Sequence, residues 1–244
     1  MEILGIVLGF CLCIGSVVSY VPQFIKIVQS KSVESISEPS LILMNIGMMC
    51  LCMNICIEYW NFFFCTDFEC FSNLFPFLNV TISWLMVLIY YSIFITFKIK
   101  KTEKRVISAL SYAFTYCIFA ILVVALALGE KLENSNGFFS IYSKVLGISS
   151  AIANGLVYLP QIYILYKSEK NGSISILMYL LQTPGNVVVI IFQILFHASV
   201  YTWITYLVVL VEQMIILSLL LYNLKVEREQ IKLKQFAENF QSEE

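Results

Sequence analysis

Long apolar segments, separated by short polar breaks, make up most of this chain. A helix needs about 20 consecutive apolar residues to cross the hydrocarbon core of a bilayer. Seven segments reach this length and predict membrane-spanning helices at residues 3–25, 39–60, 74–97, 106–128, 142–166, 174–196 and 202–224. Little sequence remains between or beyond them for a soluble domain.

The order of polar residues within these segments repeats after 138 residues. Tyr-Val-Pro-Gln at residues 20–23 precedes Ser-Ile-Ser at 35–37, and Tyr-Leu-Pro-Gln at 158–161 precedes Ser-Ile-Ser at 173–175. The same shift aligns Gly47 with Gly185 without a gap. An ordered run of Pro, Gln, Ser and Gly is more than shared hydrophobicity produces, so the chain contains an internal repeat.

The repeat predicts how the seven spans are arranged. Spans 1–3 form one unit and spans 5–7 form the other, and the single span between them makes both units cross the membrane in the same direction. We therefore predict an all-α membrane protein with two parallel three-helix bundles joined by a linker helix (3+1+3), an arrangement known among transporters. The predicted divisions are a first repeat at 1–100, the linker at 101–138, a second repeat at 139–225 and a tail at 226–244.

Basic residues are distributed unequally between the two ends of the predicted spans. The net charge is only −1, but thirteen of the fifteen Lys and Arg residues fall on the side that holds the C-terminus. The positive-inside rule places that side in the cytosol and the N-terminus in the lumen or outside. The two exceptions are Lys131 and Lys144.

The chain lacks the sequence patterns of enzymes and metalloproteins. We find no phosphate-binding loop, no Ser-His-Asp set and no metal-ligand spacing, so we expect no enzyme activity, cofactor, metal or nucleic-acid partner. The expected partners are a small-molecule substrate, protons and the lipid bilayer. Cys65 and Cys70 lie in a loop predicted to face the lumen. That compartment permits a disulfide between them without requiring one.

The two Pro-Gln pairs stand near the predicted cytosolic ends of spans 1 and 5. Pro22 and Pro160 leave the carbonyl four residues earlier without its helical donor, which predicts a kink in each helix. The amides of Gln23 and Gln161 are expected to help satisfy those carbonyls. Matched kinks favour a pair of hinges, and the alternative is two static kinks that improve packing.

A second proline lies in the middle of span 6. Pro184 and Gly185 predict a helix break, flanked by Gln182 and Asn186. Discontinuous helices near the midplane often line a binding cavity. The alternative is a packing kink satisfied by Thr183 or Gln182.

Glu212 is an ionisable residue at mid-membrane depth. It follows Trp203 by nine residues, which places it about 14 Å deep at 1.5 Å per residue. A bare charge there costs about 2.5–3.5 kcal/mol, so the carboxyl is expected to face the bundle. It would exchange a proton, attract a cationic substrate, or remain a neutral hydrogen-bonded group. Asn154 and Asn186 are its polar companions, and they either bind solute or join helices.

Two further pairs occupy equivalent positions of the repeats. Ser37 and Ser175 stand just before spans 2 and 6 and are predicted to be helix N-caps. Tyr20 and Tyr158 adjoin the Pro-Gln pairs and are either gating residues or interfacial aromatics.

The 3+1+3 pattern with Pro-Gln at the ends of spans 1 and 5 resembles the PQ-loop repeat family. That family includes cystinosin, the lysosomal and vacuolar cationic amino acid exporters and, more distantly, SWEET sugar transporters and KDEL receptors. We predict secondary transport of a small polar solute, with Glu212 favouring proton coupling. The resemblance implies that the solute is an amino acid and that the membrane is endolysosomal or vacuolar. One alternative is a SWEET-like sugar uniporter, which would not need Glu212. The other is a cargo receptor like the KDEL receptor, which would need basic groups that the spans lack at mid-membrane depth.

Overall fold

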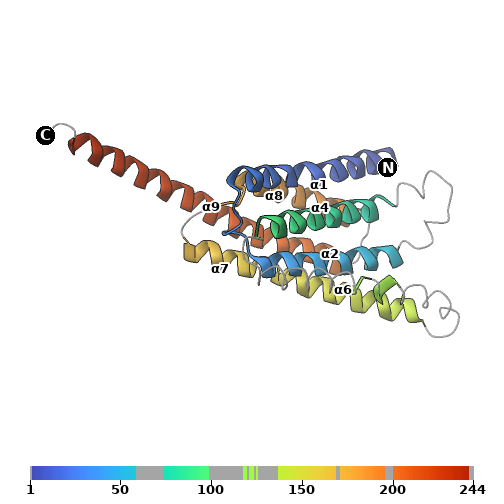
Figure 1. The fold of residues 1–244 in the computed structure, drawn as a ribbon. Coiled ribbons are helices and arrows are strands. Elements are labelled where there is room, and N and C mark those ends of the chain that lie inside the picture. The colour runs from blue at the N-terminus through green and yellow to red at the C-terminus, as the bar shows by residue number, and fades with distance from the viewer. Residues whose placement is uncertain are drawn as a thin grey trace.

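The computed structural model describes residues 2–58, 74–98, 118–119, 121–123, 125, 137–168, 171–195 and 200–241. Throughout these residues the regular secondary structure is helical, as predicted. The helices, drawn in Figure 1, are α1 (Glu2–Ser30), α2 (Glu38–Glu58), α4 (Phe75–Lys98), α6 (Phe138–Leu156), α7 (Leu159–Ser168), α8 (Ile176–Leu195) and α9 (Val200–Gln241). They form a bundle from which the end of α9 projects (Figure 1).

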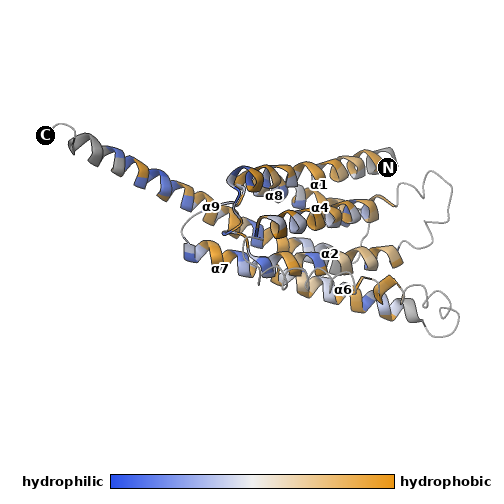
Figure 2. Ribbon diagram, in the orientation of Figure 1, coloured by the Kyte–Doolittle hydropathy of each residue, from blue (hydrophilic) through white to orange (hydrophobic). Residues whose placement is uncertain are grey.

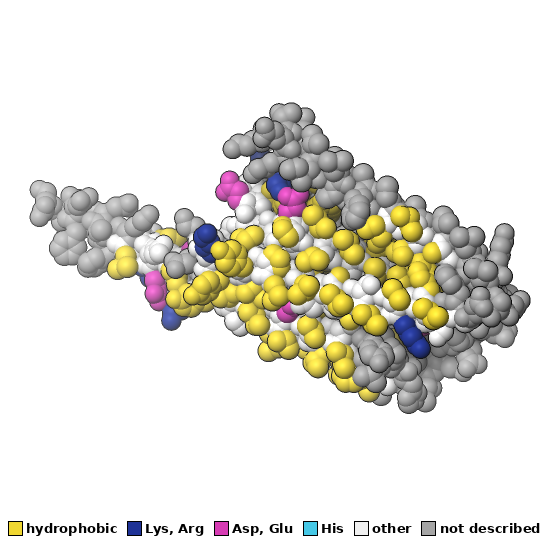
Figure 3. Space-filling view, turned by 90° about the horizontal axis from the view of Figure 1, so that it is seen from below, with side chains coloured by type: hydrophobic (Ala, Val, Ile, Leu, Met, Phe, Trp, Pro, Cys, Tyr) yellow, Lys and Arg dark blue, Asp and Glu magenta, His cyan; other side chains and the backbone are white. Residues whose placement is uncertain are grey.

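Six helical stretches in the described part of the chain are long and apolar enough to cross a membrane, with α6 and α7 counted as one. The seventh predicted span, 106–128, lies mostly outside the described residues. Hydrophobic residues dominate the helices of the bundle (Figure 2), and apolar side chains cover much of the described surface on the face seen in Figure 3. Ile14, Ile148 and Ile191 are 49%, 57% and 52% exposed. Exposed apolar surface of this extent fits contact with lipid, so the chain is an integral membrane protein.

The packing of the helices follows the internal repeat. Within the first unit α4 packs against α1 and α2, and within the second unit α9 packs against α6 and α8. Between the units α1 packs against α8 and α2 packs against α6. Exchanging the units turns each of these pairs into another observed pair. The two repeats are therefore related by an approximate twofold axis, and the predicted 3+1+3 fold is confirmed.

Small residues allow the two units to approach closely. A Cβ on Gly47 of α2 would lie 3.0 Å from Asn154 Oδ1 and 3.2 Å from the Cβ of Ala153 on α6. Ser150 of α6 donates a hydrogen bond to the Gly47 carbonyl over 3.1 Å. The α2–α6 contact thus combines close backbone approach with a hydrogen bond, as is common between membrane helices.

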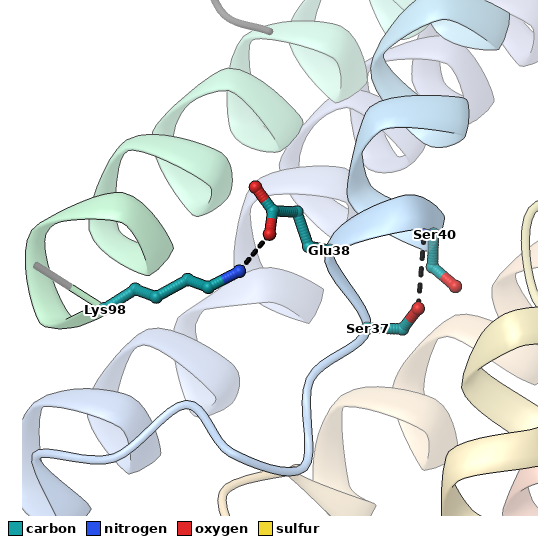
Figure 4. A network of polar contacts seen from close by, with 4 residues as sticks. All are labelled: Ser37, Glu38, Ser40 and Lys98. Carbon is teal, nitrogen blue, oxygen red and sulfur yellow. Dashed lines mark hydrogen bonds and ion pairs between the residues drawn. The ribbon is translucent and has the colours of Figure 1, made fainter. Parts of the chain in front are cut away.

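The connections from α1 to α2 and from α7 to α8 lie at one end of the bundle, which we call the loop end. There the Oγ atoms of Ser37 and Ser175 accept hydrogen bonds from the backbone N–H groups of Ser40 and Met178, each over 3.3 Å. The predicted N-caps are confirmed. Figure 4 shows Ser37 with the neighbouring ion pair, in which Lys98 at the end of α4 meets Glu38 at the start of α2.

Candidate functional site

A cavity of about 320 Å³ lies between the two units. We call it the central cavity. Its polar lining from the first unit is Ser16, Ser19, Tyr20, Asn79 and Ser83. The second unit contributes Asn154, Tyr158, Gln182, Asn186, Thr205, Tyr206 and Gln213. No charged side chain is among the described residues that line it. The cavity is therefore equipped for neutral hydrogen bonding.

Gln213 of α9 is at the centre of a hydrogen-bonded group that we call the amide cluster. Its Oε1 accepts from Asn186 Nδ2 over 2.8 Å. Its Nε2 donates to the Tyr158 hydroxyl over 3.0 Å and to Gln182 Oε1 over 3.3 Å. The cluster brings together three of the residues singled out in the sequence, and its central member was missed.

Glu212 lies beside the cavity and does not line it. Its side chain is buried, and Oε2 has no hydrogen-bond partner among the described residues. Val208 is one turn earlier on α9, and its Cγ1 would lie 3.8 Å from a Cβ built on Gly155 of α6. Glu212 is therefore expected to lie toward α6, as predicted for a carboxyl that avoids lipid. Asn154 also lines the cavity, and its Nδ2 donates to Ser150 Oγ over 3.0 Å.

The two Pro-Gln glutamines each hold the loop of the opposite repeat. Gln23 Nε2 donates to the Ser173 carbonyl over 3.0 Å, and its Oε1 accepts from the Ser175 N–H over 2.7 Å. Gln161 Nε2 donates to the Ser35 carbonyl over 2.8 Å, and its Oε1 accepts from the Ser37 N–H over 2.8 Å. We call these four hydrogen bonds the glutamine exchange.

The glutamine exchange overturns one prediction. The amides of Gln23 and Gln161 were expected to help satisfy the carbonyls freed by the neighbouring prolines, yet both bind backbone across the repeat boundary. Both side chains are buried, so their polar atoms need partners. Lys26 adds a hydrogen bond from Nζ to the Ile174 carbonyl. The loop end is thus closed by contacts between the two units.

The two prolines lie in different backbone settings. Helix α1 continues through Pro22, whereas α6 ends at Leu156 and α7 begins at Leu159, just before Pro160. Val157 and Tyr158, between these helices, line the central cavity. Val157 keeps right-handed helical backbone angles (φ −59°, ψ −41°), so the interruption is a local one in an otherwise continuous span. Of the two predicted flexible points, only the one in the second unit coincides with an interrupted helix.

Pro184 and Gly185 do not break their helix. Helix α8 runs from Ile176 to Leu195 with Pro184 inside it, so the predicted break is wrong. Thr183 Oγ1 donates to the Tyr179 carbonyl over 2.7 Å. Membrane helices tolerate proline where side chains and neighbouring helices stabilise the turn. Gly185 lines the cavity, and a Cβ there would meet nothing within 4 Å.

Four buried tyrosines separate the cavity from the loop end. Tyr20, Tyr90, Tyr158 and Tyr179 line a void of about 20 Å³ that also touches Ser37 and Gln161. The rings of Tyr158 and Tyr179 pack edge-on at 6.3 Å, and those of Tyr20 and Tyr90 at 6.5 Å. We call these four residues the tyrosine layer. Tyr20 and Tyr158 are therefore inside the bundle and not at a membrane interface.

Comparison with known proteins identifies the repeat. The PQ loop repeat matches residues 4–64 and 142–202, which together make up half of the chain. The chain belongs to the PQ-loop repeat family. A relative, the uncharacterized protein C4C5.03 of Schizosaccharomyces pombe, is 24% identical over 95% of this chain and 84% of its own length.

The fold of this PQ-loop protein is similar to a solved structure of a eukaryotic SWEET transporter. The TM-score is 0.60 at 16% identity, covering 92% of this chain and 98% of the other. At this identity the likeness concerns the fold. Cys65, Cys70 and most of the linker span lie outside the described residues.

Proposed function

We propose that this protein is a secondary transporter of a small polar organic solute, working by alternating access between its two repeats. The observation that carries the proposal is a cavity between the repeats that has polar side chains from both of them and is closed at the loop end by the tyrosine layer and the glutamine exchange. A solute held in the cavity would reach the loop end only if both layers separate.

The interruption between α6 and α7 supports a mechanism for that separation. Gln161 lies on α7, immediately after the interruption, and it binds the loop of the first repeat. Rotation of α7 about Val157 and Tyr158 would withdraw Gln161 from that loop and move Tyr158 out of the tyrosine layer. One change at the break would therefore open both layers together, in the manner of a hinge.

The solute is proposed to be an amino acid, and Glu212 supports proton coupling. An unpartnered buried carboxyl oxygen is stabilised when the group is protonated, so occupancy of the cavity and protonation can influence one another. We further propose that the loop end faces the cytosol, because most basic residues lie on that side, and that the protein resides in an endolysosomal or vacuolar membrane.

A sugar uniporter is the second candidate, and a specific observation favours it. The described lining residues are uncharged, and a neutral polyhydroxylated solute requires no counter-charge. Uniport would also leave Glu212 without a role in coupling. A receptor for a peptide carboxylate receives less support, because no Lys or Arg is among those lining residues.

The test is uptake by purified protein in liposomes, with labelled amino acids and sugars, in the presence and absence of a proton gradient. We expect amino acid uptake that the gradient stimulates, and we expect Glu212→Gln to lose the stimulation. Glu229→Gln, on the exposed part of α9 beyond the bundle, is the matched control and should behave as wild type.

The outcomes separate the candidates. Sugar uptake that ignores both the gradient and Glu212→Gln would replace the amino acid proposal with uniport. No uptake of any solute by folded, monodisperse protein would contradict transport and favour a receptor.

A further inference from the structure

The central cavity presents different chemistry at equivalent positions of its two repeats. The 138-residue shift aligns Met44 with Gln182 and Met48 with Asn186. All four side chains line the cavity. Because an approximate twofold axis relates the units, α2 carries its two methionines on the side opposite the two amides of α8. A solute between these two helices therefore meets methionines on α2, which we call the apolar wall, and amides on α8, which we call the polar wall. Ser16, Ser19, Asn79 and Ser83 add polar groups to the lining from α1 and α4.

The polar wall has unused hydrogen-bonding capacity. A side-chain amide offers two N–H donors and two acceptor lone pairs. The amide cluster uses one Asn186 donor and one Gln182 acceptor in its bonds to Gln213. Donors and acceptors thus remain on the same wall. This combination suits a polar group that both donates and accepts, such as the neighbouring ammonium and carboxylate of an amino acid.

The apolar wall has no comparable capacity. Met44, Met48 and Leu51 line the cavity from α2. Methionine is unbranched and polarizable, so it adapts to apolar groups of different shape. A sugar carries hydroxyl groups on every side, and those facing this wall would lose their hydrogen bonds to water without replacement. An aliphatic or thioether side chain would lose none.

We propose that the solute is an amino acid with an aliphatic or thioether side chain, such as leucine or methionine. Its amino and carboxylate groups contact the amide cluster, and its side chain packs on Met44 and Met48. The inference rests on the proposed transport function and specifies the substrate class of that site. The cavity volume of about 320 Å³ is near the lower end of small-molecule sites, roughly 300–1,000 Å³, as one small solute requires.

The experiment measures direct uptake of labelled leucine, methionine, serine, asparagine and glucose by proteoliposomes, together with the unfolding temperature of the protein in each solute. We expect the half-saturating concentration for uptake of leucine and methionine to be at least about tenfold lower than that of serine. A single methylene in an apolar pocket changes selectivity by about 10–200-fold. The same two solutes should raise the unfolding temperature most.

Variants of Met48 test the apolar wall itself. Met48→Asn gives α2 the residue of the equivalent α8 position, and it should reduce the preference for leucine over serine by about tenfold. Met48→Leu keeps the wall apolar and should retain the preference. An unchanged preference in Met48→Asn, or transport of only serine, asparagine or glucose, would overturn this inference and leave transport standing. No uptake and no thermal shift with any solute would overturn the transport function and this inference with it.

Discussion

In the first repeat Pro22 lies inside a continuous α1, whereas in the second repeat the helix is interrupted at Val157 and Tyr158, just before Pro160. The glutamines that follow the two prolines nevertheless do the same thing. Each donates to one serine carbonyl and accepts from one serine N–H in the opposite loop. The repeats thus share the contacts that close the loop end and differ in the helix that precedes those contacts.

Equivalent positions of the two repeats also differ in their surroundings near the central cavity. Gly47 and Gly185 are equivalent, yet Gly47 is in close contact with Asn154 and Gly185 is open to the cavity. Backbone hydrogen bonding and loop closure depend on both repeats equally. In the proposed mechanism, motion and solute recognition instead depend on features that only one repeat has. This would allow a twofold-related frame to bind an asymmetric solute.

Replacing each proline is expected to have the largest and most unequal effect. In Pro160→Ala the new N–H can bond to the Leu156 carbonyl and close the interruption, and the transport rate should fall at least about tenfold, as about 1.4 kcal/mol of barrier produces. In Pro22→Ala the helix is already continuous, and the rate should change by less than about twofold. Uptake rates of folded protein in liposomes measure both. Equal effects would contradict a hinge confined to the second repeat.

Replacing each glutamine is expected to have smaller and equal effects. Gln23→Leu and Gln161→Leu each leave two backbone groups of the opposite loop without their partners, and each should destabilise the protein by about 1–3 kcal/mol. Thermal unfolding in detergent gives the comparison. Gln29→Leu is the control, because Gln29 is exposed on the same helix as Gln23. A large loss of stability in only one of the two variants would contradict equal contributions of Gln23 and Gln161 to the closed loop end.

The equivalent glycines should show the smallest effects, with opposite signs. Gly47→Ala brings a Cβ to 3.0 Å from Asn154 Oδ1 and should destabilise the protein by about 1 kcal/mol, the lower end of the usual overpacking cost. Gly185→Ala has room for the methyl group and should stabilise the α8 helix by about 0.5–1 kcal/mol. The free energies of unfolding of the two variants provide the test. A stabilising Gly47→Ala would contradict the close approach of α2 and α6.

Local sequence features predicted the helices and their caps. Span length and the 138-residue repeat gave the 3+1+3 fold, and Ser37 and Ser175 could be identified as caps because a cap binds backbone only three residues away. The partners of Gln23 and Gln161 could not be predicted in this way. They are more than 120 residues distant in sequence and come together only when the two units pack.

Helix phase explains why the sequence did not identify Gln213 as a lining residue of the central cavity. Span 7 is apolar on all faces around Glu212, so its pattern does not show which face is buried. Adjacent residues of a helix point about 100° apart, and Gln213 lines the cavity while Glu212 does not. The break predicted at Pro184 failed for a related reason. Sequence shows the missing N–H, whereas the packing that keeps α8 continuous comes from its neighbours.

The most direct test of alternating access is the reactivity of a cysteine placed between the two closing layers. Ser40 is 4% exposed and lines the small void under the tyrosine layer. In protein whose other cysteines are replaced and whose transport is retained, Ser40→Cys would be labelled with an impermeant maleimide from the loop end. We predict slow labelling at rest and faster labelling while a transported solute is present. Fast labelling at rest, or a rate that the solute does not change, would contradict the account.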